Sequence, residues 1–268
     1  MSNIESVNAL LTAINFDRFA EIEARHQPDA VFTSFRGPTL HDSVGVADWH
    51  RLFLRDYADC NYSELEYVED GDTVCVRATI EAKGYDWRPF TQRVLEVFRM
   101  EDGAIAERRL YGMLRDVELD KAAAAVMTNA TGYRGGSAAD TRRAVEGFYG
   151  ALLAGKAEEA MGYLHEKSLM VDSVYGITTG QQNILDLLAQ IPTPAFGYWR
   201  VNKVFAGPKD AVAELSIDPS RPRAGDWIRM VDGKIAVIEA HWMLREIGLN
   251  PYENYAHDRH RRQVILPI

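Results

Sequence analysis

The sequence predicts an α+β protein made of two similar domains, and three observations lead to this expectation. Segment 97–116 (VFRMEDGAIAERRLYGMLRD) aligns with 227–246 (WIRMVDGKIAVIEAHWMLRE), with nine of twenty positions identical. In each half, segments with helical spacing precede a run of short strands, which is typical of an α+β fold. An Asp-Gly pair also separates the last two strands of each half, as in a tight hairpin.

Helices are expected at the start of both halves because apolar residues recur there at the spacing of one helix face. They are Val7, Leu10, Leu11 and Ile14 in the first half, and Val145, Phe148 and Leu152 in the second. A short helical segment, a strand and a further helix should follow in each half. The two strands are AVFTSF (30–35) and SLMVDSV (168–174), and the further helices are marked by Trp49, Leu52 and Phe53 or by Ile184, Leu187 and Leu188.

A run of strands completes each half. In the first half these are YSELEYV (62–68), TVCVRATIEA (73–82), RVLEVFRM (93–100) and AIAERRLYGML (104–114); in the second they are YWRVNKVF (198–205), AVAELSI (211–217), DWIRM (226–230) and IAVIEAHWML (235–244). Between the halves, TNATGYRGGSAAD (128–140) is rich in small and turn-forming residues, as a linker would be. We therefore expect a domain at 1–120, a linker at 121–140, a domain at 141–248 and a C-terminal tail at 249–268.

The composition narrows the classes of function. A formal charge of −9 disfavours binding to nucleic acid or to an anionic membrane. No apolar run approaches the roughly 18 residues of a membrane span, and the N-terminus lacks the order of a signal peptide, so we expect a cytoplasmic protein. Cys60 and Cys75 are expected to be small core residues. HDRH (257–260) lacks further ligands at metal spacing, and no phosphate-binding loop or nucleophile elbow occurs, so we expect neither a metal nor a cofactor.

The element order, with RMEDGAIAE (99–107) and RMVDGKIAV (229–237) at the hairpins, resembles the nuclear transport factor 2 superfamily. Within it, the closest resemblance is to SnoaL-like polyketide cyclases and related isomerases, dehydratases and epoxide hydrolases, and it covers nearly all of both halves. It implies cone-shaped, barrel-like domains whose helices and curved, mostly antiparallel sheet enclose a hydrophobic pocket. Members are commonly dimeric through the opposite sheet face, which here implies an internal pseudo-dimer, present as a monomer or a homodimer.

The second hairpin suggests where chemistry would occur. If Asp232 and Gly233 form a two-residue loop without a bulge, Asp226 lies opposite Glu239, and both share a sheet face with His241. Two carboxylates in a partly dry pocket cannot both ionise cheaply, so one should titrate at raised pH, beside a histidine suited to acid/base catalysis. The same register places a largely apolar set on the reverse face, for packing between the domains: Trp227, Arg229, Ala236, Ile238, Ala240, Trp242 and Leu244.

The first half differs at the corresponding positions. Glu96 is expected opposite Arg109, where the opposite charges would pair. We therefore expect the second domain to be catalytic and the first to be structural or to position substrate. Two further proton-transfer groups of the second half have no counterpart in the first: His241 corresponds to Tyr111, and Asp172 to Thr33.

These patterns predict a cofactor-independent acid/base enzyme that acts on a small hydrophobic substrate by cyclisation, isomerisation, dehydration or epoxide opening. The alternative is a non-catalytic module for small-molecule binding or assembly, since such folds also hold pockets without chemistry. At individual positions the alternative is packing: a bulge would break the hairpin register, and His241 or the Tyr149 ring would then belong to the core. The expected catalytic residues are Glu239, His241, Asp226 and Asp172, and the expected substrate contacts are Tyr149, Tyr175, Trp199, Met243, Arg109 and Tyr111.

Overall fold

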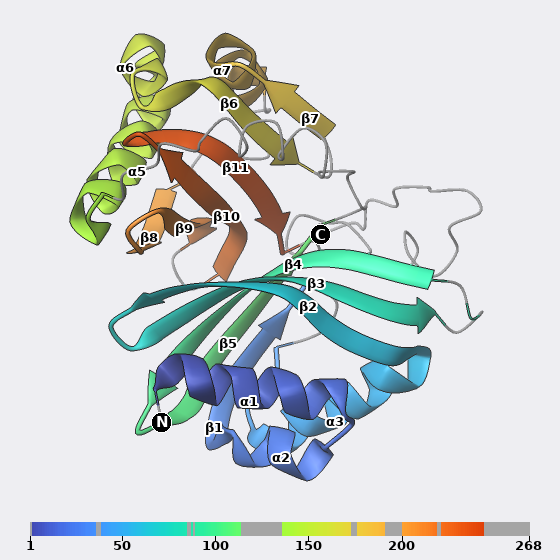
Figure 1. The fold of residues 1–268 in the computed structure, drawn as a ribbon. Helices are drawn as coiled ribbons and strands as arrows, with labels where there is room; N and C mark the ends of the chain where they lie inside the picture. Colours follow the sequence, from blue (N-terminus) through green and yellow to red (C-terminus); the bar gives the residue numbers. More distant parts are fainter. Residues whose placement is uncertain are drawn as a thin grey trace. The chain divides into compact units, whose positions relative to one another are not determined.

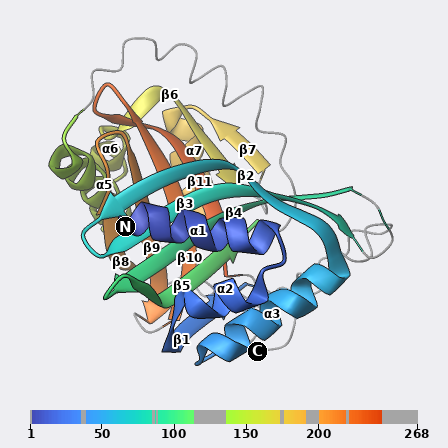
Figure 2. The same cartoon turned by 60° about the horizontal axis from the view of Figure 1, so that its bottom comes forward.

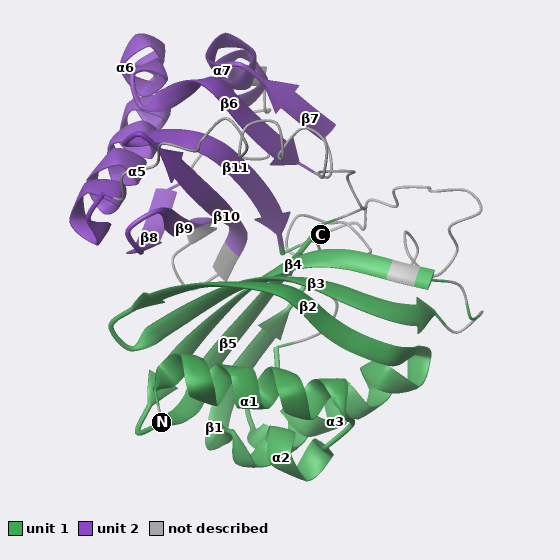
Figure 3. Ribbon diagram, viewed as in Figure 1, with its two compact units in different colours: residues 1–116, 243–268 green, residues 117–242 purple. Residues whose placement is uncertain are grey.

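The computed structural model of the chain describes residues 2–35, 39–84, 87, 89–113, 136–172, 176–190, 200–218 and 221–243. The chain divides into two compact units: unit 1 is 1–116 with 243–268, and unit 2 is 117–242 (Figure 3). The expected tail and most of the expected linker lie outside the described residues. Within the described ranges, no helix is long and apolar enough to cross a membrane.

Unit 1 packs its helices on one face of a curved sheet (Figures 1 and 2). The sheet order is β2-β3-β4-β5-β1, and every neighbouring pair is antiparallel except β1 with β5. This arrangement confirms the α+β class predicted for this half. The elements are α1 (Asn3–Asn15), α2 (Phe19–Ala24), β1 (His26–Ser34), α3 (Ser43–Asp56), β2 (Tyr57–Asp70), β3 (Thr73–Gly84), β4 (Pro89–Glu101) and β5 (Ala104–Gly112).

The first helix forms where the apolar spacing predicted it. A capping box closes its start: the Ser2 hydroxyl accepts from the Glu5 amide at 3.2 Å, and the Glu5 carboxylate accepts from the Ser2 amide at 2.7 Å. These two bonds satisfy amide groups that a helix start would otherwise leave unpaired. The face that carried the spacing is buried: Val7, Leu10, Leu11 and Ile14.

Unit 2 repeats this order and adds one short strand. Its sheet order is β7-β6-β11-β10-β9-β8, again antiparallel except for β6 with β11. In both units, therefore, the first strand lies parallel to the last. The elements are α5 (Ala138–Leu153), α6 (Ala157–Met161), β6 (Leu164–Asp172), β7 (Gly176–Thr179), α7 (Gln181–Gln190), β8 (Arg200–Ala206), β9 (Asp210–Asp218), β10 (Arg221–Val231) and β11 (Lys234–Trp242).

Both hairpins turn at the predicted Asp-Gly pair. The φ angles of Asp102 and Gly103 are 50° and 81°, and those of Asp232 and Gly233 are 50° and 74°. Positive φ at both loop residues is the geometry that such two-residue turns require. The predicted turn positions are therefore confirmed.

The predicted register beyond the turns is wrong, because each hairpin contains a β-bulge. In unit 2 the pairing shifts by one residue between Arg229 and Met230, so Asp226 lies opposite Ala240 and not opposite Glu239. In unit 1 the same shift places Glu96 opposite Leu110 and not opposite Arg109. Because side chains alternate along a strand, one extra residue transfers every later side chain to the other face.

The bulge decides which residues of β11 meet the helices of unit 2. Ile238 and Ala240 belong to a buried hydrophobic cluster with residues of α5, α6 and α7, so they lie on the helix-covered face. They had been expected on the reverse face, together with Trp242. By alternation, Glu239 and His241 lie on that reverse face instead.

Candidate functional site

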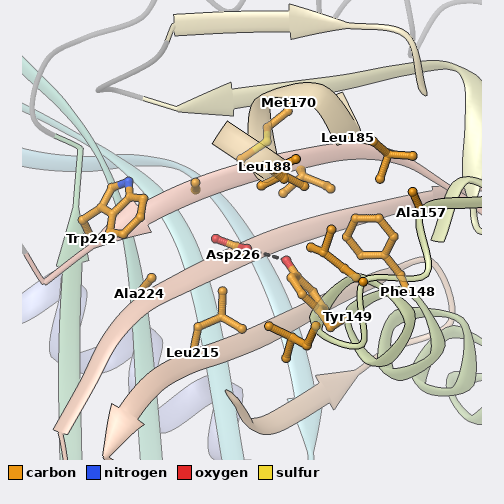
Figure 4. Close-up of a pocket in the computed structure, with 16 residues that line it drawn as sticks. Phe148, Tyr149, Ala157, Met170, Leu185, Leu188, Leu215, Ala224, Asp226 and Trp242 are labelled. Carbon is orange, nitrogen blue, oxygen red and sulfur yellow. Dashed lines mark hydrogen bonds between the residues drawn. The ribbon is translucent and has the colours of Figure 1, made fainter. Parts of the chain in front are cut away.

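Unit 2 contains a cavity of about 550 Å³ between its helices and the helix-covered face of its sheet (Figure 4). Helix α5 forms one wall, α7 and β6 form another, and β9, β10 and β11 supply the floor. Nearly all of the lining is apolar, so the cavity suits a largely hydrophobic molecule. The described lining residues are Phe148, Tyr149, Leu152, Leu153, Gly155, Ala157, Met170, Leu185, Leu188, Ala189, Leu215, Ala224, Asp226, Ile238, Ala240 and Trp242.

Asp226 is the only acidic residue in this lining. It projects from β10 and is 5% exposed, and the Tyr149 hydroxyl from α5 donates a hydrogen bond to its Oδ2 (Figure 4). Burial raises the pKa of Asp226 to about 7; the Tyr149 hydrogen bond opposes this rise, and the charge of Asp172 adds to it. A carboxyl group that titrates near neutral pH in an apolar cavity can either accept or donate a proton.

Tyr149 and Asp226 are coupled in both directions. Burial raises the pKa of the Tyr149 phenol well above its usual value, and the adjacent Asp226 raises it further. The phenol therefore stays protonated and keeps donating to the carboxylate. The hydroxyl orients Asp226, and it is the carboxyl group that titrates.

Asp172 lies behind the cavity wall. It ends β6 opposite Ala240, is fully buried, and accepts a hydrogen bond from the Trp242 indole Nε1 at 3.0 Å. This bond fixes the Trp242 ring, which lines the cavity. Asp172 therefore acts on the cavity through Trp242 and through its charge, and it is not among the described lining residues. By strand register its counterpart in unit 1 is Ser34, opposite Leu110, whereas the predicted counterpart, Thr33, lies opposite Arg109.

Glu239 and His241 do not join this group, although they were expected to share its face. Both are buried, at 2% and 0% exposure. His241 Nε2 lies 3.2 Å from Glu239 Oε1, and His241 Nδ1 lies 3.0 Å from the Glu239 carbonyl oxygen. They form a local pair on the reverse face of β11, and the bulge is the reason for their separation from Asp226.

The corresponding place in unit 1 is filled by an ion pair. Glu96 of β4 accepts a hydrogen bond from Arg108 Nε of β5 at 2.5 Å, and both side chains are almost fully buried. Arg108 Nη1 donates to His50 Nε2 at 2.7 Å, which places the His50 proton on Nδ1. Burial, followed by the charge of Arg108, holds the pKa of His50 well below its usual value. The cation beside Glu96 is thus Arg108, a residue that the expected register had not singled out.

The remaining predicted contacts fall elsewhere. Arg109 pairs with Glu107, and Tyr111 is fully buried on the reverse face of β5 from Glu96. Neither therefore shares a face with Glu96, as the unbroken register had required. Met243 is buried but is not among the described cavity residues. Tyr175 and Trp199 lie outside the described residues.

Three residues that sequence reasoning had not assigned to the pocket help to form it: Ile238, Trp242 and Leu185. The first two had been placed on the reverse face by the unbroken register. The signal that could have found them is the run of small and apolar residues at alternate positions of 238–242, which is as consistent with a pocket floor as with a packing face. Leu185 follows helical spacing from Leu188, which predicted a helix but not what it covers.

Comparison with known proteins places this fold in context. Residues 7–108 match the SnoaL-like domain family, so unit 1 contains a SnoaL-like domain. No curated protein matches the chain. Solved structures with an NTF2-like fold align with less than half of it. An NTF2-like protein of unknown function from Burkholderia pseudomallei K96243 is 22% identical over 42% of this chain and 92% of its own, with a TM-score of 0.39.

Two further solved structures are described as candidate polyketide cyclases. IdmH from Streptomyces antibioticus is 20% identical over 42% of this chain and 92% of its own length, with a TM-score of 0.39. The protein from Pseudomonas putida KT2440 is 16% identical over 41% and 91%, with the same TM-score of 0.39. At these identities the likeness concerns the fold alone.

Proposed function

We propose that unit 2 is a cofactor-independent acid/base enzyme for a small hydrophobic metabolite, with Asp226 as the proton-transfer group. The observation that carries this proposal is a single carboxyl group, with a pKa of about 7, facing an apolar cavity of about 550 Å³. General bases work best when their pKa lies near the working pH. The reaction classes that fit are isomerisation, cyclisation, dehydration and epoxide opening.

The chemistry begins with ionised Asp226. Its free oxygen takes a proton from a C–H or O–H group of the substrate, and the electron pair of the broken bond stays on the substrate. The Tyr149 hydroxyl holds the other oxygen, which fixes the direction in which the carboxylate points. Protonated Asp226 then returns the proton to a different atom in an isomerisation, or to a departing oxygen in a dehydration. Few water molecules fit beside an apolar substrate, which strengthens these electrostatic interactions.

Glu239 and His241 have no place in this scheme, since they lie on the reverse face of β11. Asp172 takes a positioning role, because it holds Trp242 and raises the pKa of Asp226 through its charge. The proposal therefore keeps Asp226 and Tyr149 from the expected residues and assigns the proton transfer to Asp226 alone.

We also propose that the two units arose by tandem duplication and diverged. The same element order, the same parallel pairing of first and last strands, and a bulge at equivalent points of both hairpins support this proposal. Only unit 2 would carry the reaction, because the ion pair of Glu96 and Arg108 occupies the equivalent place in unit 1. The reverse sheet faces, with Val97 and Trp227 among their buried residues, would serve as the surfaces of an internal pseudo-dimer.

Proton transfer can be tested before the natural substrate is known. A panel of small apolar ketones is incubated with the protein in deuterated water, and exchange at the carbon next to the carbonyl is followed by NMR. The wild-type protein should accelerate exchange for at least one ketone, and Asp226→Asn should lower that rate by about 100-fold or more. Asp186→Asn, which removes an exposed carboxylate from α7, is the matched control and should keep the wild-type rate.

Equal rates for the wild type and Asp226→Asn would refute the proposed role of Asp226. Tight binding of a panel member without any exchange would favour the alternative, a non-catalytic binding module. That alternative is supported by one observation: Asp226 is the only acidic or basic side chain among the described lining residues.

A further inference from the structure

The two units carry a buried carboxyl group at the same point of the fold but surround it differently. Glu96 of β4 and Asp226 of β10 each lie five residues before the bulge pair, and each faces the helices of its unit. In unit 1 the next strand brings Arg108 opposite Phe98; in unit 2 the equivalent residue is Ile238, opposite Ile228. The same acid position thus has a cation beside it in one unit and an isoleucine in the other.

The cation of unit 1 is embedded as well as paired. Arg108 Nε donates to Glu96 at 2.5 Å, and the guanidinium carbon lies 4.7 Å from the centre of the Phe32 ring and 5.4 Å from that of Phe98. Burial acts to lower the pKa of Arg108, but the charges of Glu96 and Tyr62 outweigh burial and raise it. Because a buried charge is costly unless it is paired, Arg108 is what makes an ionised Glu96 tolerable there.

In unit 2 the space that a guanidinium would take is part of the cavity. None of the sixteen described lining residues is Lys, Arg or His, while Asp226 faces the cavity and Asp172 lies close enough to act on it electrostatically. The walls include the aromatic side chains of Phe148, Tyr149 and Trp242 (Figure 4). An acid without a protein cation, set among aromatic rings, matches the way proteins bind organic ammonium groups.

We propose that the ligand of the unit 2 cavity is a hydrophobic organic cation, whose ammonium group sits against Asp226 where unit 1 has the guanidinium of Arg108. This inference builds on the proposed function only in taking the cavity as the ligand site, and it holds for a bound effector as well as for a substrate. The apolar lining receives the body of the molecule, and the aromatic rings contact the ammonium group. An anionic ligand is excluded, because its charge would meet Asp226 and Asp172 with no cation nearby.

The inference also fixes the pH dependence of binding. The groups that face Asp226 are the Tyr149 hydroxyl from α5 and the Asp172 carboxylate at the end of β6; its strand neighbours are Ala213 of β9 and Ala240 of β11. A cation beside Asp226 favours its ionised form, so binding near pH 6.5 should release a proton from the protein. Affinity for the cation should therefore increase as the pH rises from 6 to 8 and then level off.

The test uses three probes that share one body and differ in charge: 1-naphthylmethylamine, 1-naphthalenemethanol and 1-naphthoic acid. Their affinities for the full-length chain are measured by calorimetry at pH 6 and pH 8. At pH 8 the amine should bind about tenfold or more tighter than the alcohol, since an opposite charge at close range in a buried site has an effect of at least this size. The acid should show no binding. Near pH 6.5, amine binding should release protons, seen as a heat that depends on the ionisation enthalpy of the buffer.

Matched variants show whether the preference comes from Asp226. Asp226→Asn keeps the shape and should reduce amine affinity to that of the alcohol, whereas Asp186→Asn removes an exposed charge from α7 and should leave the preference unchanged. Ile238→Arg restores the arrangement of unit 1 and should abolish amine binding. Equal affinities for amine and alcohol, a preference that survives Asp226→Asn, or no amine binding at all would overturn the inference. Ketone exchange by the wild type would then still stand, so failure here is distinguishable from failure of the proposed proton transfer.

Discussion

Replacing Asp226 with Asn should stabilise the folded chain at pH 8. Asp226 is buried and its pKa is raised to about 7, whereas an aspartate in an unfolded chain titrates near about 3.9. Between these two pH values the unfolded chain has released the proton and the folded chain still holds it. Stability therefore falls as the pH rises through this window and levels off above about pH 7.

The size of the effect follows from the width of this window. Each pH unit between the unfolded and folded pKa values corresponds to about 1.4 kcal/mol. At pH 8, the ionisable group at position 226 should therefore lower the free energy of unfolding by on the order of 4 kcal/mol, relative to its contribution at pH 4. Asparagine has the same shape and an oxygen that can accept from Tyr149, so the variant loses the ionisation without losing the hydrogen bond.

Urea unfolding of both proteins, followed by tryptophan fluorescence at pH 4, 6, 7 and 8, measures this difference. Asp226→Asn should be more stable by about 2–4 kcal/mol at pH 8, with a gain that shrinks to about zero at pH 4. Asp186→Asn controls for the general loss of one negative charge and should change stability by less than about 0.5 kcal/mol at each pH. A variant no more stable than the wild type at pH 8, or a gain that does not depend on pH, would refute the reasoning.

Three further predictions concern the surroundings of the two acids. Tyr149→Phe removes the hydrogen bond that lowers the pKa of Asp226, so the pH–rate profile for ketone exchange should move to higher pH; Asp172→Asn removes a charge that raises this pKa and should move the profile to lower pH. In unit 1, Arg108→Met leaves Glu96 buried without its cation and should lower the free energy of unfolding by about 3–5 kcal/mol, whereas the double variant with Glu96→Gln should recover most of that loss; unchanged stability of the single variant would contradict the pairing. Finally, residues 1–120 and 136–248 expressed separately should self-associate in sedimentation experiments if the reverse sheet faces pack together, and two well-behaved monomers would count against the pseudo-dimer.

Local signals were sufficient to predict much of the fold. The spacing of Val7, Leu10 and Leu11 predicted α1, because one face of a helix must be apolar to pack on a sheet. Asp102-Gly103 and Asp232-Gly233 predicted both turns, because few other residue pairs adopt positive φ at two successive positions without strain. Such signals are carried by neighbouring residues, so they survive without knowledge of distant contacts.

The site could be predicted only in part, because it depends on a single inserted residue. Asp226 and Tyr149 were selected for the right part of the molecule, but the partner expected for Asp226 was Glu239, which the bulge turns to the other face. The residues that follow Gly233 alternate smoothly enough to fit either register, so the pattern does not reveal the bulge. The same shift concealed Arg108, which an unbroken register directs away from Glu96.

The contrast between the two acids makes the cavity of unit 2 more than a packing defect. Unit 1 fills the corresponding space with the buried side chain of Arg108, and the Phe35 ring packs so closely over Gly112 that an added Cβ would lie 2.7 Å from it. Unit 2 has Ile238 and Trp242 at the positions that align with Arg108 and Gly112, and it retains an open volume of about 550 Å³. An open cavity forfeits packing, and an acid held there without a protein cation lowers stability further. A fold that can close this space, as unit 1 does, and yet keeps it open beside an ionisable acid is better explained by a bound molecule than by folding.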